Sequence, residues 1–388
     1  MVTDLLAALA FTGWLLALLD PRRRWARALR LDEESLPPVA ATDRVVAIVP
    51  ARDEAEALPA ALPSLLSQTH ERFHVVLVDD RSSDRTGAVA RSLAETAGRS
   101  DRLTVVDGIP QPAGWSGKVN AQDRALSALR DNASGRAEWL LLTDADIRHP
   151  PDSVERLLAK ARDGDFDLVS IMARLRAETF WERLLVPPFV FFFHLLYPFA
   201  RVNANRGRLA AAAGGCILVR RQLFEEAGGF EAIRGEIIDD VAVAKLVKSR
   251  GGRLWLGFHP GVESIRPYTR LAEIWRMVAR TAFVQLRRSY ALLALTCLLM
   301  LVFLIAPPGL TVGCFATGQA TAGALALAAW LVPAGMLLPF TLYHRVPGFY
   351  ALLLPLASLL YLLMTLSSGW NQLRGRGPEW KGRSYGSA

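Results

Sequence analysis

Two kinds of hydrophobic pattern divide the chain. Long apolar runs lie near both ends, at residues 3–19, which are almost wholly apolar, and at 289–343 and 346–373, which are uncharged; short apolar runs lie between them. A membrane-spanning helix needs about 20 apolar residues. We therefore expect an N-terminal anchor helix, two spans in the second run and one in the third, with breaks at Pro307-Pro308-Gly309 and at 344–348.

The short central runs are rich in leucine and β-branched residues, which is typical of buried strands. The predicted strands cover residues 45–50, 74–79, 103–106 and 139–144. Helical patterns, for instance at 55–68 and 86–97, separate them. This alternation predicts a parallel, doubly wound α/β sheet, which binds ligands at the carboxyl ends of its strands.

Three polar clusters follow these strands: residues 50–54 (P-A-R-D-E), Asp79-Asp80 and Asp144-Ala145-Asp146. Mg²⁺ and Mn²⁺ bind one or two carboxylates together with substrate phosphates, so the D-A-D sequence suits a metal-chelated diphosphate. Such a metal acts as a Lewis acid on the leaving group. A lone D-x-D more often caps a helix or lies in solvent. The strand context and the other clusters favour the metal.

The acidic pair Asp79-Asp80 precedes Ser83 and Asp84, either of which can cap the next helix. Adjacent carboxylates cost stability unless a cation or a hydrogen-bond donor binds them. We therefore interpret the pair as part of a ligand site.

Residues 180–200 are apolar enough to be mistaken for a further span. A crossing there would separate Asp144 and Asp146 from the acidic pair Asp239-Asp240. Pro187-Pro188 also interrupts the run. An interfacial element or a wall of an acceptor groove is the better interpretation.

Composition supports a membrane protein: 52% of residues are hydrophobic and the mean hydropathy is +0.22. Lys and Arg number 45 against 37 Asp and Glu, with basic runs at 21–25 and 374–383 beside apolar segments. Anionic lipid and a pyrophosphate are expected partners, and nucleic acid is not, because no recognition motif accompanies the charge. The first basic run should be cytoplasmic. Four crossings would leave the basic tail outside, against the same tendency, and the sequence leaves that conflict open.

The ordered motifs resemble the family 2 glycosyltransferases with the GT-A fold, over about residues 44–290. The motifs are P-A-R-D-E, D-D-x-S-x-D-x-T (79–86), D-A-D, the acidic pair 239–240 and Q-L-R-R (285–288). Within that superfamily, G-W-S-G-K-V (114–119) and W-K-G-R (380–383) are similar to the hopene-associated glycosyltransferase (HpnB) family.

The resemblance implies a domain order: 1–20 N-terminal anchor, 21–43 linker, 44–288 GT-A domain with 180–200 interfacial, 289–370 three C-terminal transmembrane helices and 371–388 basic tail. It also implies a multi-pass protein of the bacterial cytoplasmic membrane, with its catalytic domain in the cytoplasm.

The resemblance further implies roles for individual residues. Nucleotide-sugar contacts are Glu54, Asp79, Asp80, Lys118, Asp144, Gln285 and Arg288; the metal ligands are Asp146 and Asp144; the acceptor side has Gly214, Gly215 and Asp239; the catalytic base is Asp240. Each has a simpler alternative, because Asp239-Asp240 can merely cap a helix, Lys118 can be solvated, and Arg287 and Arg288 can anchor the chain to the bilayer. Processive synthases carry a tryptophan after the last arginine, and its absence here favours a single transfer.

We therefore expect an inverting, metal-dependent transferase that moves a sugar from a nucleotide donor, a UDP-sugar by resemblance, to a hopanoid-related lipid. A polyprenyl-phosphate or carotenoid-type acceptor is the alternative within the class. A non-catalytic scaffold or a lipid transporter is the alternative outside it, and the uncharged C-terminal runs argue against coupled transport.

Overall fold

The computed structural model describes residues 2–20, 29–38, 43–130, 137–205, 207–377, 379–380 and 383–384. The chain forms two compact units. The helical unit comprises Met1–Arg27, Arg176–Ala200 and Pro267–Pro378, and the sheet unit comprises Ala28–Leu175, Arg201–Arg266 and Glu379–Ala388. The basic run 21–25, most of the 21–43 linker, and Lys381 and Gly382 of the W-K-G-R motif lie outside the described residues.

The sheet unit is built on one eight-stranded sheet with the order β3-β2-β1-β4-β7-β6-β8-β5. Its strands are β1 (Val45–Ala51), β2 (Phe73–Asp79), β3 (Leu103–Asp107), β4 (Trp139–Leu142), β5 (Ile147–Arg148), β6 (Leu168–Leu175), β7 (Ile217–Arg220) and β8 (Leu254–Ser264). Strands β1 to β4 pair in parallel, as do β6 and β8, whereas β7 and β5 run antiparallel to their neighbours. The four predicted strands and the mostly parallel sheet are therefore confirmed.

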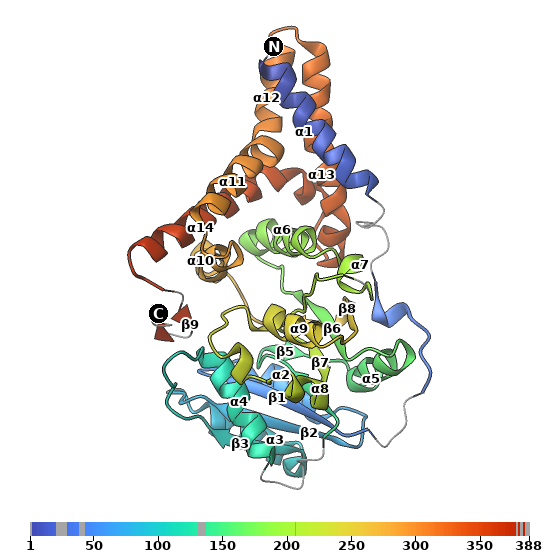
Figure 1. Cartoon of the computed structure of the whole chain (residues 1–388), viewed down its shortest axis with the longest axis vertical. Helices are drawn as coiled ribbons and strands as arrows, with labels where there is room; N and C mark the ends of the chain where they lie inside the picture. Colours follow the sequence, from blue (N-terminus) through green and yellow to red (C-terminus); the bar gives the residue numbers. More distant parts are fainter. Residues whose placement is uncertain are drawn as a thin grey trace. The chain divides into compact units, whose positions relative to one another are not determined.

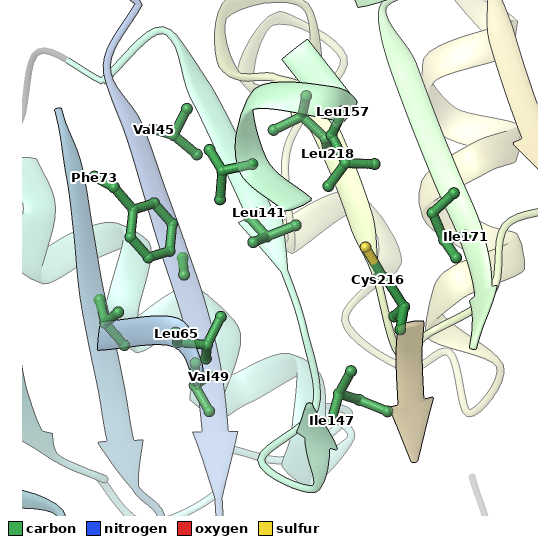
Figure 2. Close-up of a cluster of buried hydrophobic side chains, with 14 of the residues drawn as sticks. Val45, Val49, Leu65, Phe73, Leu141, Ile147, Leu157, Ile171, Cys216 and Leu218 are labelled. Carbon is green, nitrogen blue, oxygen red and sulfur yellow. The ribbon is translucent and has the colours of Figure 1, made fainter. Parts of the chain in front are cut away.

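Helices pack on the sheet, and strand β1 is buried along its whole length. Alternate residues of β1 pack into one apolar cluster, and Figure 2 shows Val45 and Val49 in it with Leu65, Leu157 and Ile171. Helices α2 (Leu58–Leu66), α3 (Thr86–Thr96) and α5 (Ser153–Asp163) contribute to this cluster. The sheet unit also contains α4 (Gly117–Arg130), α8 (Arg221–Glu226) and α9 (Asp239–Ser249), and α4 packs on β1 and β2 (Figure 1). Short 3-10 turns lie at Leu31–Glu33, Ser100–Arg102 and Glu231–Ile233.

The helical unit contains the apolar runs from both ends of the chain. Its elements are α1 (Val2–Leu19), α6 (Phe180–Leu196), α10 (Leu271–Gln285), α11 (Tyr290–Met300), the π-helical turn η6 (Leu301–Ile305), α12 (Ala306–Ala316), α13 (Ala320–Tyr343), η7 (Gly348–Leu353) and α14 (Leu354–Leu373). The short α7 (Phe199–Val202) follows α6. Helix α13 packs against α1, α12 and α6, and α14 packs against α10, α11 and α6.

Among the residues that the structure describes, five helices are long and apolar enough to cross a membrane. They are Val2–Leu19, Phe180–Val202, Tyr290–Ala316, Ala320–Tyr343 and Gly348–Leu373. Four of them coincide with the predicted anchor and C-terminal spans. The remaining one includes the 180–200 segment, for which length and composition alone permit a crossing, so its interfacial placement stays a prediction.

One predicted helix break was wrong. Pro307, Pro308 and Gly309 lie inside the Tyr290–Ala316 helix, and the chain breaks instead between Ala316 and Ala320, where Gly318 has a φ of +76°. The prolines are tolerated because they lie in the first turn of α12, where a missing N–H is least costly, directly after the π-helical turn. The second predicted break, at 344–348, is confirmed.

Glu182 ties together two chain segments of the helical unit. Its carboxylate is fully buried and accepts hydrogen bonds from the backbone N–H groups of Glu178 and Thr179 (both 2.9 Å) and of Tyr268 (2.7 Å). Thr179 in turn caps α6 by accepting from the Glu182 N–H, which completes a capping box.

Replacing Glu182 by glutamine should lower the melting temperature of the full-length protein in detergent. The new NH₂ group would face a backbone donor, and a buried hydrogen bond lost in this way costs about 1–3 kcal/mol. The matched control is Glu178→Gln, because that side chain is largely exposed, and it should leave the melting temperature unchanged. Equal melting temperatures for the two variants would contradict the assigned role.

Candidate active site

The centre of the site is a lysine that joins two carboxylates from distant elements. Lys118 lies in the first turn of α4, and its Nζ is 2.8 Å from Asp144 Oδ1 and 3.0 Å from Asp239 Oδ2. Burial alone would lower the pKa of Lys118, but the two carboxylates outweigh burial and hold that pKa above its usual range. A cation at a helix N-terminus is opposed by the helix dipole, and the carboxylates offset that cost. Lys118 is therefore a permanently charged partner of both acids and not a solvated side chain.

Asp144 responds to the same surroundings. It follows β4, and burial raises its pKa, while Lys118 opposes that rise and the charges of Asp146 and Asp239 add to it. The net direction is upward. One turn further along α4, Gln122 Nε2 donates to Asp239 Oδ2 at 3.4 Å, so the acid of α9 has two partners on α4.

Asp240 lies beside this pair and is held by backbone donors. Its Oδ2 accepts from the Gly214 N–H at 2.9 Å, and its Oδ1 accepts from the Val241 N–H at 2.7 Å. Burial, followed by the charge of Asp239, raises the pKa of Asp240 to about 7, although Lys118 and the two donors oppose the shift. Because Gly214 belongs to another element, helix capping does not account for this contact.

Gly214 lies next to Asp240 and has no side chain. A Cβ atom on this residue would lie 3.4 Å from both Asp240 Oδ2 and Lys118 Nζ. The glycine therefore presents bare backbone towards the carboxylate and the lysine. A Cβ on Gly215 would instead lie 3.0 Å from the Ile147 side chain, so that glycine serves packing. The structure brings together Lys118, Asp144, Asp239, Asp240 and Gly214.

A second ion-pair centre engages the other acid of the D-A-D sequence. Arg266 follows β8, and its Nε donates to Asp146 Oδ2 at 2.7 Å while its Nη2 donates to Glu54 Oε1 at 2.5 Å. Asp146 and Glu54 are both buried. Arg266 thus links the carboxyl ends of β1, β4 and β8.

The acidic pair after β2 has structural partners. Asp79 accepts from the backbone N–H groups of Ser82 and Gly87, both at 3.0 Å, which ties it to the start of α3. Asp80 is fully buried, and Arg52 Nη1 donates to its carbonyl at 2.8 Å. The N-cap position of α3 is Arg85, not Ser83 or Asp84, and it has no side-chain cap hydrogen bond. Asp84, one residue earlier, accepts from the Thr86 N–H and hydroxyl at the first residue of the helix.

The donor set fits a divalent metal only together with a diphosphate. In the described part of the chain, no group of three or more His, Cys, Asp or Glu residues could hold an ion by itself. Asp144 and Asp146 supply the one or two carboxylates that Mg²⁺ or Mn²⁺ takes alongside substrate phosphates. Each of these acids already faces a protein cation, Lys118 or Arg266.

Two of the predicted residues are not part of these clusters. Gln285 and Arg288 belong to the helical unit, where Gln285 Nε2 donates to the Tyr197 hydroxyl at 2.6 Å and Arg288 is exposed. Conversely, sequence reasoning missed Arg266 and Gln122. Arg266 could have been found by the rule that identified the acids, because it too follows the carboxyl end of a strand.

Comparison with known proteins bears on the type of domain and on the fold. Residues 46–228 match the family model described as glycosyl transferase family 2. The match includes Glu54, Lys118, both D-A-D acids and Gly214. This part of the chain is thus similar to glycosyl transferase family 2, the family that the motif order resembles.

Individual relatives are more distant. The chain is 28% identical over 144 residues to the undecaprenyl-phosphate 4-deoxy-4-formamido-L-arabinose transferase of Proteus mirabilis (strain HI4320), which is 36% of this chain and 40% of the relative. The enzyme of that name from Pseudomonas aeruginosa (strain LESB58) is 27% identical over 148 residues, or 36% and 39% of the two chains. The chain therefore matches about 40% of the length of these curated relatives.

Among solved structures, the mannosyltransferase PcManGT from Pyrobaculum calidifontis aligns with 96% of this chain and 99% of its own, at 20% identity and a TM-score of 0.54. At this identity the likeness concerns the fold alone. The mixed α/β sheet with an N-terminal helix and several apolar C-terminal helices is GT-A-like, as the sequence predicted.

Replacing Arg266 by methionine should lower the melting temperature, because Asp146 and Glu54 would lose a shared buried counter-charge. Added Mn²⁺ should then raise the melting temperature of the variant more than that of the wild type, since no arginine competes for Asp146. Arg250→Met, at an exposed position after α9, is the control and should change neither quantity. Equal Mn²⁺ shifts in Arg266→Met and the wild type would refute the competition.

Asp240 should make stability depend on pH in a defined window. The folded chain keeps a proton up to about pH 7 that the unfolded chain releases near the ordinary value of 3.8. The contribution of Asp240 to the free energy of unfolding is therefore fully present below pH 3.8 and is lost as the pH rises to about 7. The melting temperature of the wild type minus that of Asp240→Asn should fall between about pH 5 and about pH 7 and then level off. The control is Asp163→Asn at an exposed acid of α5, for which this difference in melting temperature should not change with pH. A difference for Asp240→Asn that also stays constant would contradict the raised pKa.

Proposed function

We propose that the protein transfers a sugar from a nucleotide-diphosphate donor to a membrane lipid, with inversion at the anomeric carbon. The observation that carries this proposal is the position of Asp240, a half-buried carboxylate that accepts from the Gly214 and Val241 N–H groups beside the Lys118–Asp144 pair; its raised pKa, about 7, agrees with that position. A general base works best when its pKa lies near the working pH. A fixed cation next to a D-A-D acid suits the diphosphate of the donor.

The proposed reaction is a single in-line displacement. An oxygen of the acceptor bonds to the anomeric carbon while the bond from that carbon to the diphosphate oxygen breaks, and the electron pair leaves with the nucleoside diphosphate. Asp240 accepts the proton of the attacking group. Lys118 stabilises the charge that develops on the leaving diphosphate, and Gly214 gives the acceptor close access to both residues.

The donor edge of the sheet would hold the nucleotide. Asp79, Asp80 and Glu54 lie at the ends of β2 and β1, where the base and ribose of a UDP-sugar are expected. A divalent metal held by Asp146 and Asp144 would supply Lewis-acid assistance to the leaving diphosphate. PcManGT was solved in complex with GDP-mannose and Mn²⁺, so GDP-mannose belongs in a test alongside UDP-sugars.

The acceptor is proposed to be a polyprenyl phosphate. The named relatives are undecaprenyl-phosphate transferases, and the helical unit contains five candidate spans beside which such a lipid can lie. A hopanoid-related hydroxyl lipid is the second candidate, favoured by the G-W-S-G-K-V and W-K-G-R motifs of the HpnB family.

The salt bridges of the site bear on membrane placement. Lys118 and Asp144 precede the 180–200 segment and Asp239 follows it, yet the three side chains lie within hydrogen-bonding distance in one unit. A single crossing at α6 would separate them. This contact supports an interfacial α6 and a catalytic unit on one face, which we propose is the cytoplasmic face of a bacterial inner membrane.

The test is transfer by the full-length protein in nanodiscs from UDP-sugars and GDP-mannose to undecaprenyl phosphate or to a hydroxylated hopanoid, read by mass spectrometry of the lipids. Asp240→Asn should lower transfer to a hydroxylated lipid by roughly 10²-fold or more at about pH 7, because the hydroxyl must give up its proton. Transfer to undecaprenyl phosphate should lose less, because a phosphate monoester has a second pKa of about 6 and is already mostly a dianion at that pH. Asp163→Asn should leave transfer unchanged.

The other outcomes have distinct meanings. A large loss in Asp240→Asn, with product formed only on the hydroxyl lipid, would favour the hopanoid acceptor. Activity that survives chelation of divalent ions would remove the metal from the proposal. No transfer and no donor hydrolysis with any donor would contradict the proposed function and favour a scaffold.

A further inference from the structure

Helix α10 of the helical unit has one apolar face and one basic face. Ile274, Val278 and Phe283 are buried against neighbouring helices. Arg276 is exposed and Arg280, one turn further on, is half-buried. Two like charges four residues apart on a helix destabilise it unless an anion lies between them or beside them.

The turn that carries Arg280 is fixed by α14. The hydroxyl of Ser368 donates to the Ala279 carbonyl at 2.5 Å and accepts from the Phe283 N–H at 3.0 Å. These two backbone groups are the pair that a regular α-helix joins directly. A side chain inserted there is a recognised cause of local helix opening. The backbone around Arg280 is thus held in place by α14.

The side chain of Arg280 lacks the partner that its burial requires. Its Nε is buried and makes no hydrogen bond. Within the part of the chain that the structure describes, neither Arg276 nor Arg280 forms an ion pair with an acidic side chain. A guanidinium whose N–H is withdrawn from water without an acceptor is costly. An arginine that merely extends to the membrane surface would keep its Nε hydrated.

We propose that Arg280, assisted by Arg276, binds the phosphate group of a lipid. The guanidinium is always charged, and its planar set of donors matches phosphate oxygens in pairs. An anion that arrives with a ligand would satisfy the buried Nε and relieve the repulsion between the two arginines. The helical unit, with its exposed leucines on α1, α11 and α14, suits a ligand with an apolar chain. That this lipid is the sugar acceptor rests on the proposed function.

The test is binding to the full-length protein in detergent, measured by calorimetry with farnesyl phosphate and with farnesol, which has the same chain and no phosphate. The wild type should prefer farnesyl phosphate. Arg280→Gln should weaken the binding of farnesyl phosphate by about tenfold or more, which is the usual effect of losing a hydrogen bond to a charged group. The binding of farnesol should not change. Arg280→Lys keeps the charge and loses the paired donors, so its affinity for farnesyl phosphate should lie between those of the wild type and Arg280→Gln.

The matched control is Arg345→Gln. Arg345 is an exposed residue of the helical unit, between α13 and η7 and outside both basic runs of the sequence. This variant removes the same charge from the same unit and should bind farnesyl phosphate as the wild type does. Unchanged farnesyl phosphate binding in Arg280→Gln, with an unchanged melting temperature, would overturn the proposal. An equal loss for farnesol would also overturn it, because the effect would then not concern phosphate.

Two further measurements complete the test. One distinguishes a prenyl phosphate from a bilayer headgroup, and the other distinguishes failure of the Arg280 site from failure of the proposed function. If phosphatidylglycerol competes with farnesyl phosphate only when Arg280 is present, the site takes bilayer headgroups, which supports a lipid-phosphate site with another occupant. If phosphatidylglycerol does not compete, the prenyl phosphate is the occupant. Sugar transfer and donor hydrolysis by the wild type test the sheet unit separately. The absence of both would count against the proposed function and leave the binding result for Arg280 intact.

Discussion

The arrangement of the site depends on one half-buried cation. Lys118 holds Asp144 and Asp239 together, so the first turn of α4, the end of β4 and the start of α9 must meet at one point. Without that charge, the carboxylates would repel one another in surroundings that already disfavour their ionisation. The same charge moderates the pKa of Asp240 next to them. The lysine thus sets both the geometry of the site and its proton affinity.

Much of the fold could be predicted because its signals are local. Short apolar runs indicated β1 to β4, and long apolar runs indicated the anchor and the C-terminal helices. The break at Pro307-Pro308 failed because proline disrupts a helix interior but suits a first turn, and a π-helical turn directly before it begins a new helical segment. The antiparallel placement of β7 and β5 had no local signal, since strand direction is settled by which strands pair across the sheet.

The acids of the site were predictable from their position after strands, but their partners were not. Arg266 meets Asp146 across 120 residues and Glu54 across 212, so only the position of β8 in the sheet decides that contact. The hydrogen bonds of Asp79 to the backbone at the start of α3 could not be predicted either. An aspartate that binds a ligand and one that binds backbone N–H groups look the same in sequence. Gln285 and Arg288 show the converse limit: a motif order does not reveal that its last members belong to a different unit.

The packing of α6 has a consequence for how the chain is made. Leu184 and Leu185 of α6 share an apolar cluster with Ala357 and Tyr361 of α14, although the two helices lie far apart along the chain. At a synthesis rate of ~5–20 residues per second, α6 waits on the order of 10 s for that partner. During this interval its apolar face needs a temporary cover. Bilayer lipid at the site of insertion is suited to provide it, which would make assembly at the membrane a condition of correct folding as well as of function.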